Sequence, residues 1–237
     1  MGSQLALALP EPAPKFGHGG ARAGAGRPPK KGATKHDARP SLRKDRPVHV
    51  TLRAQKVLPS LKGQLPHAVV RAALDAVRRK TEEEKAPFQI VHYSIQVDHV
   101  HLIVEATNKK TLSRGVQGLV IRIARQLNKR LFRGGKVWNE RYHRHDLKTP
   151  TEVRNALRYV LLNIRKHSRC YGQAFADPWS SGPTFDGWAE EVLVLPTDTE
   201  PWPRVRAGTW LLRTGWKRYG AISPYDTPGT RKTSAPV

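Results

Sequence analysis

Hydrophobic residues alternate with polar ones in several stretches of the chain, which is the spacing of β-strands. The first stretch, residues 47–53, carries Val or Leu at every second position. Two longer apolar stretches follow at residues 88–97 and 99–107, and only Asp98 separates them. They predict two strands joined by a tight hairpin. A shorter and more polar strand is expected at residues 137–147.

Elsewhere the apolar positions recur every three or four residues, which predicts amphipathic helices. Such helices are expected at residues 66–80, 112–132 and 151–167. Thr149 and Pro150 stand where the third helix is expected to begin, and both residue types favour a helix start. The order strand, helix, strand, strand, helix, strand, helix predicts an α+β domain with a ferredoxin-like antiparallel sheet and helices on one face.

Both ends of the chain differ from this periodic region. Residues 1–45 are rich in Gly, Pro, Ala, Lys and Arg and show no hydrophobic period, so we expect a disordered, flexible basic N-terminal arm. Residues 46–170 form the expected domain, and residues 171–237 form a C-terminal extension rich in Trp and Pro. The tryptophans of this extension either stack on unpaired bases or fill a small auxiliary core, and we favour the core.

Charge indicates the class of partner. The chain of 237 residues has 42 Lys and Arg against 19 Asp and Glu, a formal net charge of +23. Such an excess repels itself unless a polyanion neutralises it, so nucleic acid is the expected partner. A membrane surface is the second choice, but no basic amphipathic helix dominates the charge, and no apolar run reaches the ~18–20 residues of a membrane helix, so a membrane is not expected. Cys170 is the only cysteine, which excludes an intramolecular disulfide. We expect a soluble, cytoplasmic protein.

Two histidines, His99 and His101, lie two residues apart in the strand expected at residues 99–107. Side chains at this spacing share one face of a strand, about 7 Å apart, and two neutral imidazoles can bind one divalent metal ion. The alternative is a surface strand with two exposed histidines, and these residues alone leave both interpretations open. His49 either approaches such a site or is a partly exposed strand histidine, and we favour the second. We expect His92 to pack or hydrogen-bond rather than bind a metal.

Tyr159 and Asn163 lie one turn apart on the helix expected at residues 151–167, beside its apolar stripe. A phenol and a carboxamide would therefore project together from a rigid helix. The alternative for Tyr159 is a partly buried tyrosine anchored by one hydrogen bond.

Basic residues gather on the long central helix and on the polar strand after it, with few acids to balance them. They either form a solvated surface or bind the phosphates of DNA. The candidates for DNA binding are Arg122, Arg125, Lys129, Arg133, Arg141 and Arg144.

These residues resemble a known family. Residues 98–102, Asp-His-Val-His-Leu, resemble the His-hydrophobic-His signature of HUH nucleases. Tyr159 followed by Asn163 resembles the Tyr-x-x-x-Asn/Gln helix of the single-tyrosine branch, the IS200-like transposases. The asparagine, the long basic helix and Trp138 before the tyrosine helix are most similar to REP-associated tyrosine transposases. The resemblance covers about residues 46–168, and Ile164 replaces the proline that commonly follows the asparagine.

The resemblance implies a metal-dependent single-stranded DNA endonuclease and strand transferase that cleaves next to a DNA hairpin. It implies that His99, His101 and Asn163 hold Mg²⁺ or Mn²⁺, and that Tyr159 attacks phosphorus to form a 5′-phosphotyrosine intermediate. The implied partner is single-stranded or hairpin DNA in a bacterial nucleoid, bound by a monomer or a homodimer. The alternative is a catalytically inactive DNA- or RNA-binding protein on the same scaffold.

Overall fold

The structure is a computed structural model that describes residues 39–167, 174–195, 200–226 and 228. The predicted basic arm up to residue 38 therefore lies outside the described residues. The described residues from Pro40 onward belong to one compact unit. Within it, Leu42 is only 8% exposed and belongs to the main hydrophobic core. Leu42 thus packs with the domain, while the predicted bounds of the arm, the domain and the extension stay predictions.

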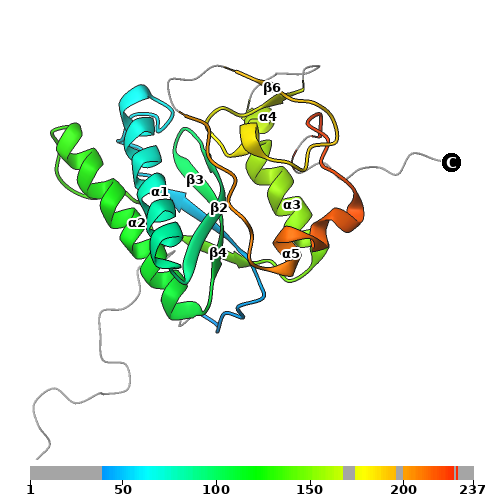
Figure 1. Ribbon diagram of the computed structural model, residues 1–237. Coiled ribbons are helices and arrows are strands. Elements are labelled where there is room, and N and C mark those ends of the chain that lie inside the picture. The colour runs from blue at the N-terminus through cyan, green and yellow to red at the C-terminus, as the bar shows by residue number, and fades with distance from the viewer. Residues whose placement is uncertain (1–38, 168–173, 196–199, 227, 229–237) are drawn as a thin grey trace, which may run out of the picture. The chain divides into compact units, whose positions relative to one another are not determined.

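Four antiparallel strands form the central sheet (Figure 1). β1 pairs with β3 and β4, and β2 pairs with β3, which gives the order β2-β3-β1-β4. This is the strand order of a ferredoxin-like sheet built from split β-α-β units, so the predicted fold class is confirmed. The strands are β1 (Val48–Arg53), β2 (Phe88–Ile95), β3 (His99–Ala106) and β4 (His143–Asp146).

Two long helices, α1 (Gln64–Glu84) and α2 (Lys109–Arg130), lie on one face of this sheet (Figure 1). The predicted apolar stripe of α2 is confirmed, because its buried residues are Leu112, Val116, Leu119, Ile123 and Leu127. They pack with alternate residues of the strands, which include Val48, Val50 and Leu52 of β1. In the part of the chain that the structure describes, no helix is both long and apolar enough to cross a membrane.

A third helix, α3 (Pro150–Leu161), covers the opposite face, where it packs against Val91 of β2 and Ile103 of β3. The expectation of helices on one face is therefore correct for α1 and α2 and wrong for α3. The reason lies in β3, which is buried on both sides from Val100 to Ala106 and so needs cover on both faces. The predicted start of α3 is confirmed, since the Thr149 hydroxyl accepts a hydrogen bond from the backbone N–H of Glu152.

The C-terminal extension completes the core on the α3 side. Its Phe185, Leu212 and Trp216 are buried in the same cluster as α3. Trp202 and Trp216 are each 2% exposed, so the use of these tryptophans as core residues is confirmed, whereas Trp210 is 45% exposed. The short elements of the extension and the helix before it are α4 (Asn163–His167), β5 (Phe175–Ala176), η1 (Gly182–Thr184), β6 (Leu193–Val194), α5 (Trp210–Arg213) and η2 (Gly215–Tyr219).

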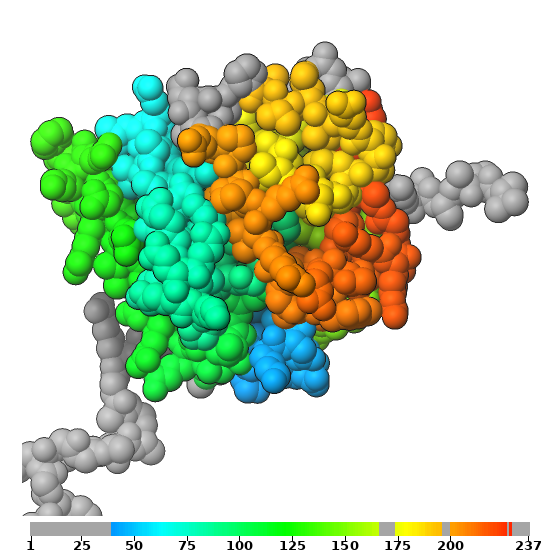
Figure 2. All heavy atoms as spheres, in the orientation of Figure 1, coloured from blue at the N-terminus to red at the C-terminus, as the bar shows by residue number. Residues whose placement is uncertain are grey.

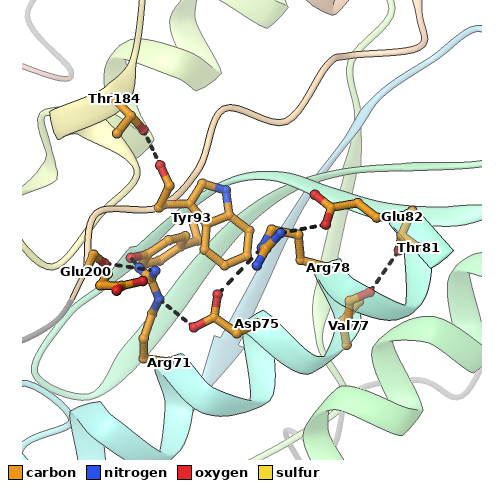
Figure 3. A network of polar contacts seen from close by, with 10 residues as sticks. Arg71, Asp75, Val77, Arg78, Thr81, Glu82, Tyr93, Thr184 and Glu200 are labelled. Carbon is orange, nitrogen blue, oxygen red and sulfur yellow. Dashed lines mark hydrogen bonds and ion pairs between the residues drawn. The ribbon is translucent and has the colours of Figure 1, made fainter.

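Arg71 of α1 connects the extension to the rest of the domain (Figure 3). Its guanidinium donates hydrogen bonds to the Asp75 carboxylate, the Tyr93 hydroxyl and the backbone carbonyl of Glu200. It also lies over the ring of Trp202, 4.9 Å from the centroid. Burial raises the pKa of Tyr93 to about 12, so this phenol is neutral at pH 7. These contacts fix the segment around Trp202 against α1.

Candidate active site

β3 presents His99 and His101 on the sheet face that α3 covers. In the sheet register, His101 stands opposite Thr51 of β1 and opposite Ser94 of β2. The centroids of the two imidazole rings are 4.6 Å apart, and the rings are nearly perpendicular, at 77°. His101 is 3% exposed and His99 is half-buried, so the alternative of two exposed surface histidines is wrong.

Protein groups contact the Nδ1 atom of each ring. Nδ1 of His101 lies 3.1 Å from the Thr51 hydroxyl and 3.2 Å from Nε2 of His49. Nδ1 of His99 lies 2.6 Å from the Asp98 carboxylate, and this hydrogen bond lowers the pKa of Asp98. Such partners orient an imidazole and select its tautomer, with Nε2 as the nitrogen that would bind a metal ion.

His49 is half-buried, as expected, and it also lies beside this site, which was the less favoured of its two predicted roles. The centroid of its ring lies 5.2 Å from that of His101 and 5.8 Å from that of Tyr159. Burial lowers the pKa of His49 to about 4, with smaller effects from His145 and His143 of β4, so its ring is neutral at pH 7. Alternation along β1 predicts the face of His49, but its position beside His101 depends on the pairing of β1 with β3, which local sequence does not encode.

Tyr159 projects from α3 toward the same group of rings. Val153, Leu157 and Val160 of this helix are buried, whereas Tyr159 is half-buried at the side of the apolar stripe, as the spacing predicted. The centroid of its ring lies 4.9 Å from that of His101, in an edge-to-face arrangement at 79°. A single chain therefore brings together the phenol from α3 and the two imidazoles from β3.

Asn163 does not continue the helix that carries Tyr159. α3 ends at Leu161, Leu162 forms a turn, and α4 begins at Asn163, so the single helix predicted at residues 151–167 is wrong at this point. Residues 160–163 are all buried at this break, so the chain is covered there on more than one side.

The carboxamide of Asn163 lies in the interior. Asn163 is 0% exposed, and neither its Oδ1 nor its Nδ2 has a hydrogen-bond partner among the described residues. A buried polar group without a partner destabilises a fold by about 1–3 kcal/mol. Such a group is therefore expected where a bound ligand satisfies it. No hydrogen bond between described atoms joins this carboxamide to His99 or His101.

The basic residues expected to bind DNA are distributed over several surfaces. Arg122, Arg125 and Lys129 are exposed on α2, which covers the sheet face opposite to His101. Arg141 is exposed in the segment before β4, the edge strand next to β1. Arg133 is half-buried and donates a hydrogen bond to the Asn128 side chain. Of these five residues, only Arg141 lies directly before the edge strand β4.

Arg144 has a structural environment. Its side chain is 6% exposed and forms a two-pronged ion pair with Asp146, with both N–O distances at 2.6 Å. Its guanidinium also donates hydrogen bonds to the backbone carbonyls of Pro40 and Ser41. The charge is thus neutralised internally, and Arg144 fastens the start of the compact unit to β4. We leave it out of the proposed DNA surface.

By donor type, the three predicted ligands suit a divalent ion. His99 and His101 offer two imidazole nitrogens, and the unsatisfied carboxamide of Asn163 offers an oxygen. The described residues contain no group of three or more His, Cys, Asp or Glu side chains that could hold a metal. The carboxamide of Asn163 is a ligand of a different type, and its oxygen suits Mg²⁺ or Mn²⁺ better than two imidazoles alone.

Part of the chain is similar to a known family. The family of IS200-like transposases (Transposase IS200 like) matches residues 60–163. This region belongs to that family. The IS200-like region contains His99, His101 and Tyr159 and ends at Asn163, whereas His49 and the C-terminal extension lie outside it.

Two solved structures share similarity with the chain. The first is a REP-associated tyrosine transposase bound to a REP hairpin, with 19% identity and a TM-score of 0.44, covering 57% of this chain and 75% of that chain. The second is a Deinococcus radiodurans R1 protein assigned provisionally as a transposase, with 17% identity and a TM-score of 0.34, covering 57% and 94%. No curated protein matches the chain. The family assignment therefore rests on residues 60–163.

Proposed function

We propose that this protein cleaves and rejoins single-stranded DNA next to a hairpin, as a tyrosine transposase with Tyr159 as the nucleophile. The observation that carries the proposal is the position of the Tyr159 ring, 4.9 Å from the ring of His101, inside an IS200-like region. The nucleophile and the groups that stabilise the charge of a phosphate must reach the same phosphorus atom. A phenol beside two imidazoles meets this requirement.

In the proposed step, the oxygen of Tyr159 forms a bond to phosphorus, and the bond from phosphorus to the 3′ oxygen breaks. The 5′ phosphate remains on Tyr159, and the other product ends in a 3′-hydroxyl. The proton that the phenol loses balances the proton that the 3′ oxygen gains. Attack by the 3′-hydroxyl of another strand reverses the step, so joining consumes no nucleotide cofactor.

A divalent ion, Mg²⁺ or Mn²⁺, would stabilise the negative charge on the phosphate oxygens when bound. His99 and His101 would hold it through Nε2, because the Nδ1 atoms face Asp98, Thr51 and His49. The carboxamide of Asn163 would supply an oxygen, which would satisfy a side chain that has no partner among the described residues.

The DNA partner follows from the family and from charge. The net charge of +23 favours a polyanion, and binding should weaken steeply with added salt. Arg141 would guide the strand past the β4 edge into the site. Arg122, Arg125 and Lys129 would contact only DNA that continues around this edge to the α2 side, for example the stem of a hairpin.

The decisive experiment uses Tyr159→Phe, which keeps the ring and removes the nucleophilic oxygen. A labelled hairpin oligonucleotide with single-stranded flanks is incubated with Mn²⁺, and covalent adducts are separated on a denaturing gel. We expect an adduct with the wild type and with the control Tyr219→Phe, whose side chain is exposed. Tyr159→Phe should form none while its DNA affinity is unchanged.

Two outcomes would overturn the proposal. If Tyr159→Phe still forms the adduct, the nucleophile is wrong. If the wild type binds the oligonucleotides in the presence of Mn²⁺ and never forms an adduct, the chain is the inactive DNA-binding protein on the same scaffold.

A further inference from the structure

A pocket of about 300 Å³ lies next to β2, and most of its lining residues belong to the C-terminal extension, outside the IS200-like match. Val91 and His92 of β2 line this pocket. The other lining residues come from residues 181–186, 202–207 and 212–217 of the extension. Figure 2 looks onto this face, where atoms of β2 are visible between the orange and yellow segments of the extension. The volume is at the lower end of the range for ligand pockets.

An irregularity in β2 directs His92 toward this pocket. The pairing of β2 with β3 shifts by one residue between Ile90 and His92, which is a β-bulge at Val91. His92 therefore pairs with Ile103 and lies on the same face as Ser94, which pairs with His101. Without the extra residue, alternation would turn His92 into the core under α1 and α2. The pocket and the histidines of the candidate active site thus share one sheet face.

His92 offers the pocket a neutral hydrogen-bonding group. Its Nδ1 lies 3.1 Å from the Ser181 hydroxyl, and its ring packs edge-on against Phe185 with centroids 5.5 Å apart. Its Nε2 has no hydrogen-bond partner within the described part of the chain. Burial lowers the pKa of His92 to about 4, so the ring is uncharged at pH 7. An uncharged imidazole suits the edge of a nucleobase, which carries donors and acceptors without charge.

The sides of the pocket are strongly basic. Arg204, Arg206, Arg213 and Lys217 line it and are exposed, and Asp186 is its one acidic residue. None of these four cations forms an ion pair with a described residue. Four cations around a base-sized hollow are complementary to a group that combines an uncharged ring with phosphates.

We propose that this pocket binds one nucleotide of the single-stranded DNA substrate, with its base at His92 and the neighbouring phosphates on the four cations. The inference rests on the proposed function for the choice of DNA as ligand. It makes the C-terminal extension a part of the DNA-binding surface, beyond the region that matches the family.

The first test compares charge removal at two places, in the Tyr159→Phe background so that no chemistry interferes. The pocket variant carries Arg204→Gln, Arg213→Gln and Lys217→Gln. The control variant carries Arg79→Gln, Lys80→Gln and Lys110→Gln, which remove the same charge from exposed positions on α1 and α2. Affinity for a fluorescent single strand is measured by anisotropy over a range of salt concentrations.

Each phosphate contact contributes about 0.7 to the slope of log affinity against log salt for a single strand. The pocket variant should therefore lose about 2 from this slope, and the control variant should keep the slope of the parent. Equal slopes in the two variants would overturn the proposal. All six positions are exposed, so both variants should fold, and a thermal melt of each variant checks this.

The second test locates the base. A series of strands with one abasic site at successive positions is bound to the parent and to His92→Ala. The parent should show one position where the missing base weakens binding about 3- to 10-fold, the value of one hydrogen bond. His92→Ala should lose this sensitivity, whereas the control His145→Ala should keep it. An identical profile in the parent and in His92→Ala would overturn the proposal.

These tests measure binding without cleavage, so their failure differs from failure of the proposed function. A wild type without adducts whose pocket variant still loses salt dependence would contradict the tyrosine chemistry alone. A wild type with adducts whose pocket and control variants behave alike would contradict the pocket alone.

Discussion

Nε2 of His49 lies 3.2 Å from Nδ1 of His101. If Nε2 of His101 is to bind a cation, the proton of this ring must reside on Nδ1 and be donated from there. His49 can accept that hydrogen bond because it is neutral, with a pKa lowered to about 4 by burial. The Thr51 hydroxyl, at 3.1 Å, is a second acceptor for the same atom. We therefore infer that His49 is a positioning residue for His101.

Replacing His49 should weaken metal binding. His49→Phe keeps a ring of similar size and removes the acceptor, and loss of such a partner of a metal-binding histidine typically lowers metal affinity about 10- to 100-fold. Because Thr51 remains, we expect a loss of about tenfold in Mn²⁺ affinity, measured by titration calorimetry. The matched control is His145→Phe, since His145 pairs with His49 across β1 and β4 and is exposed. Equal affinities of His49→Phe and the wild type would contradict the inferred role.

Asn163 should show opposite effects on stability and on function. Its carboxamide is buried without a partner among the described residues, so Asn163→Leu should raise the free energy of unfolding of the metal-free protein by about 1–2 kcal/mol. The same change removes the proposed metal ligand, so Mn²⁺ affinity and adduct formation should fall sharply. Urea unfolding in a chelating buffer and the gel assay measure the two effects.

The result for Asn163 separates a ligand from a structural residue. A variant that is less stable without metal would mean that the amide supports the fold. A variant that still forms the adduct at the wild-type rate would remove Asn163 from the metal site.

The sheet and its first two helices could be predicted from the sequence because their signals are local. Alternating apolar residues mark β1, β2 and β3, and a repeat of three to four residues marks α1 and α2. The shared face of His99 and His101 follows from the same alternation. The position of α3 could not be predicted in this way, because a helix stripe shows which side is buried and not against which face of the sheet it packs.

The remaining differences depend on contacts between distant parts of the chain. His49 meets His101 through the pairing of strands that are far apart in the sequence. Arg144 resembles any basic strand residue until the structure places Asp146 and the carbonyl of Pro40 around it. The turn at Leu162 could not be predicted from the helical spacing, because only the structure shows that residues 160–163 are all buried.

Arg71 should be important for stability and not for chemistry. Arg71→Met keeps most of the aliphatic stem and removes the hydrogen bonds to Asp75, Tyr93 and Glu200. Because these bonds are largely buried and involve a charged group, we expect a loss of about 2–3 kcal/mol in the free energy of unfolding, measured in urea. The control, Arg79→Met on the exposed side of α1, should change it by about 0.5 kcal/mol or less. An unchanged Arg71→Met would mean that the extension does not depend on this network.

Stability should decrease in mild acid because of His49 and His92. Burial lowers both pKa values from 6.5 to about 4 in the folded protein. Between these pH values the unfolded chain binds more protons than the folded one, so the free energy of unfolding rises with pH. The full stability is present above pH 6.5 and is lost progressively as the pH falls toward about 4, by up to about 3 kcal/mol for each histidine.

His92→Phe tests this dependence, because Phe cannot be protonated and keeps a ring beside Phe185. Urea unfolding of the wild type and the variant is measured between pH 7 and about pH 4, the pKa of both histidines in the folded protein. Since His49 remains, the variant should lose about half of the decrease that these two residues cause. A decrease of the same size in both proteins would show that His92 is not held neutral by burial. That result would also remove the uncharged base contact from the pocket beside β2, while the four cations around it would be unaffected.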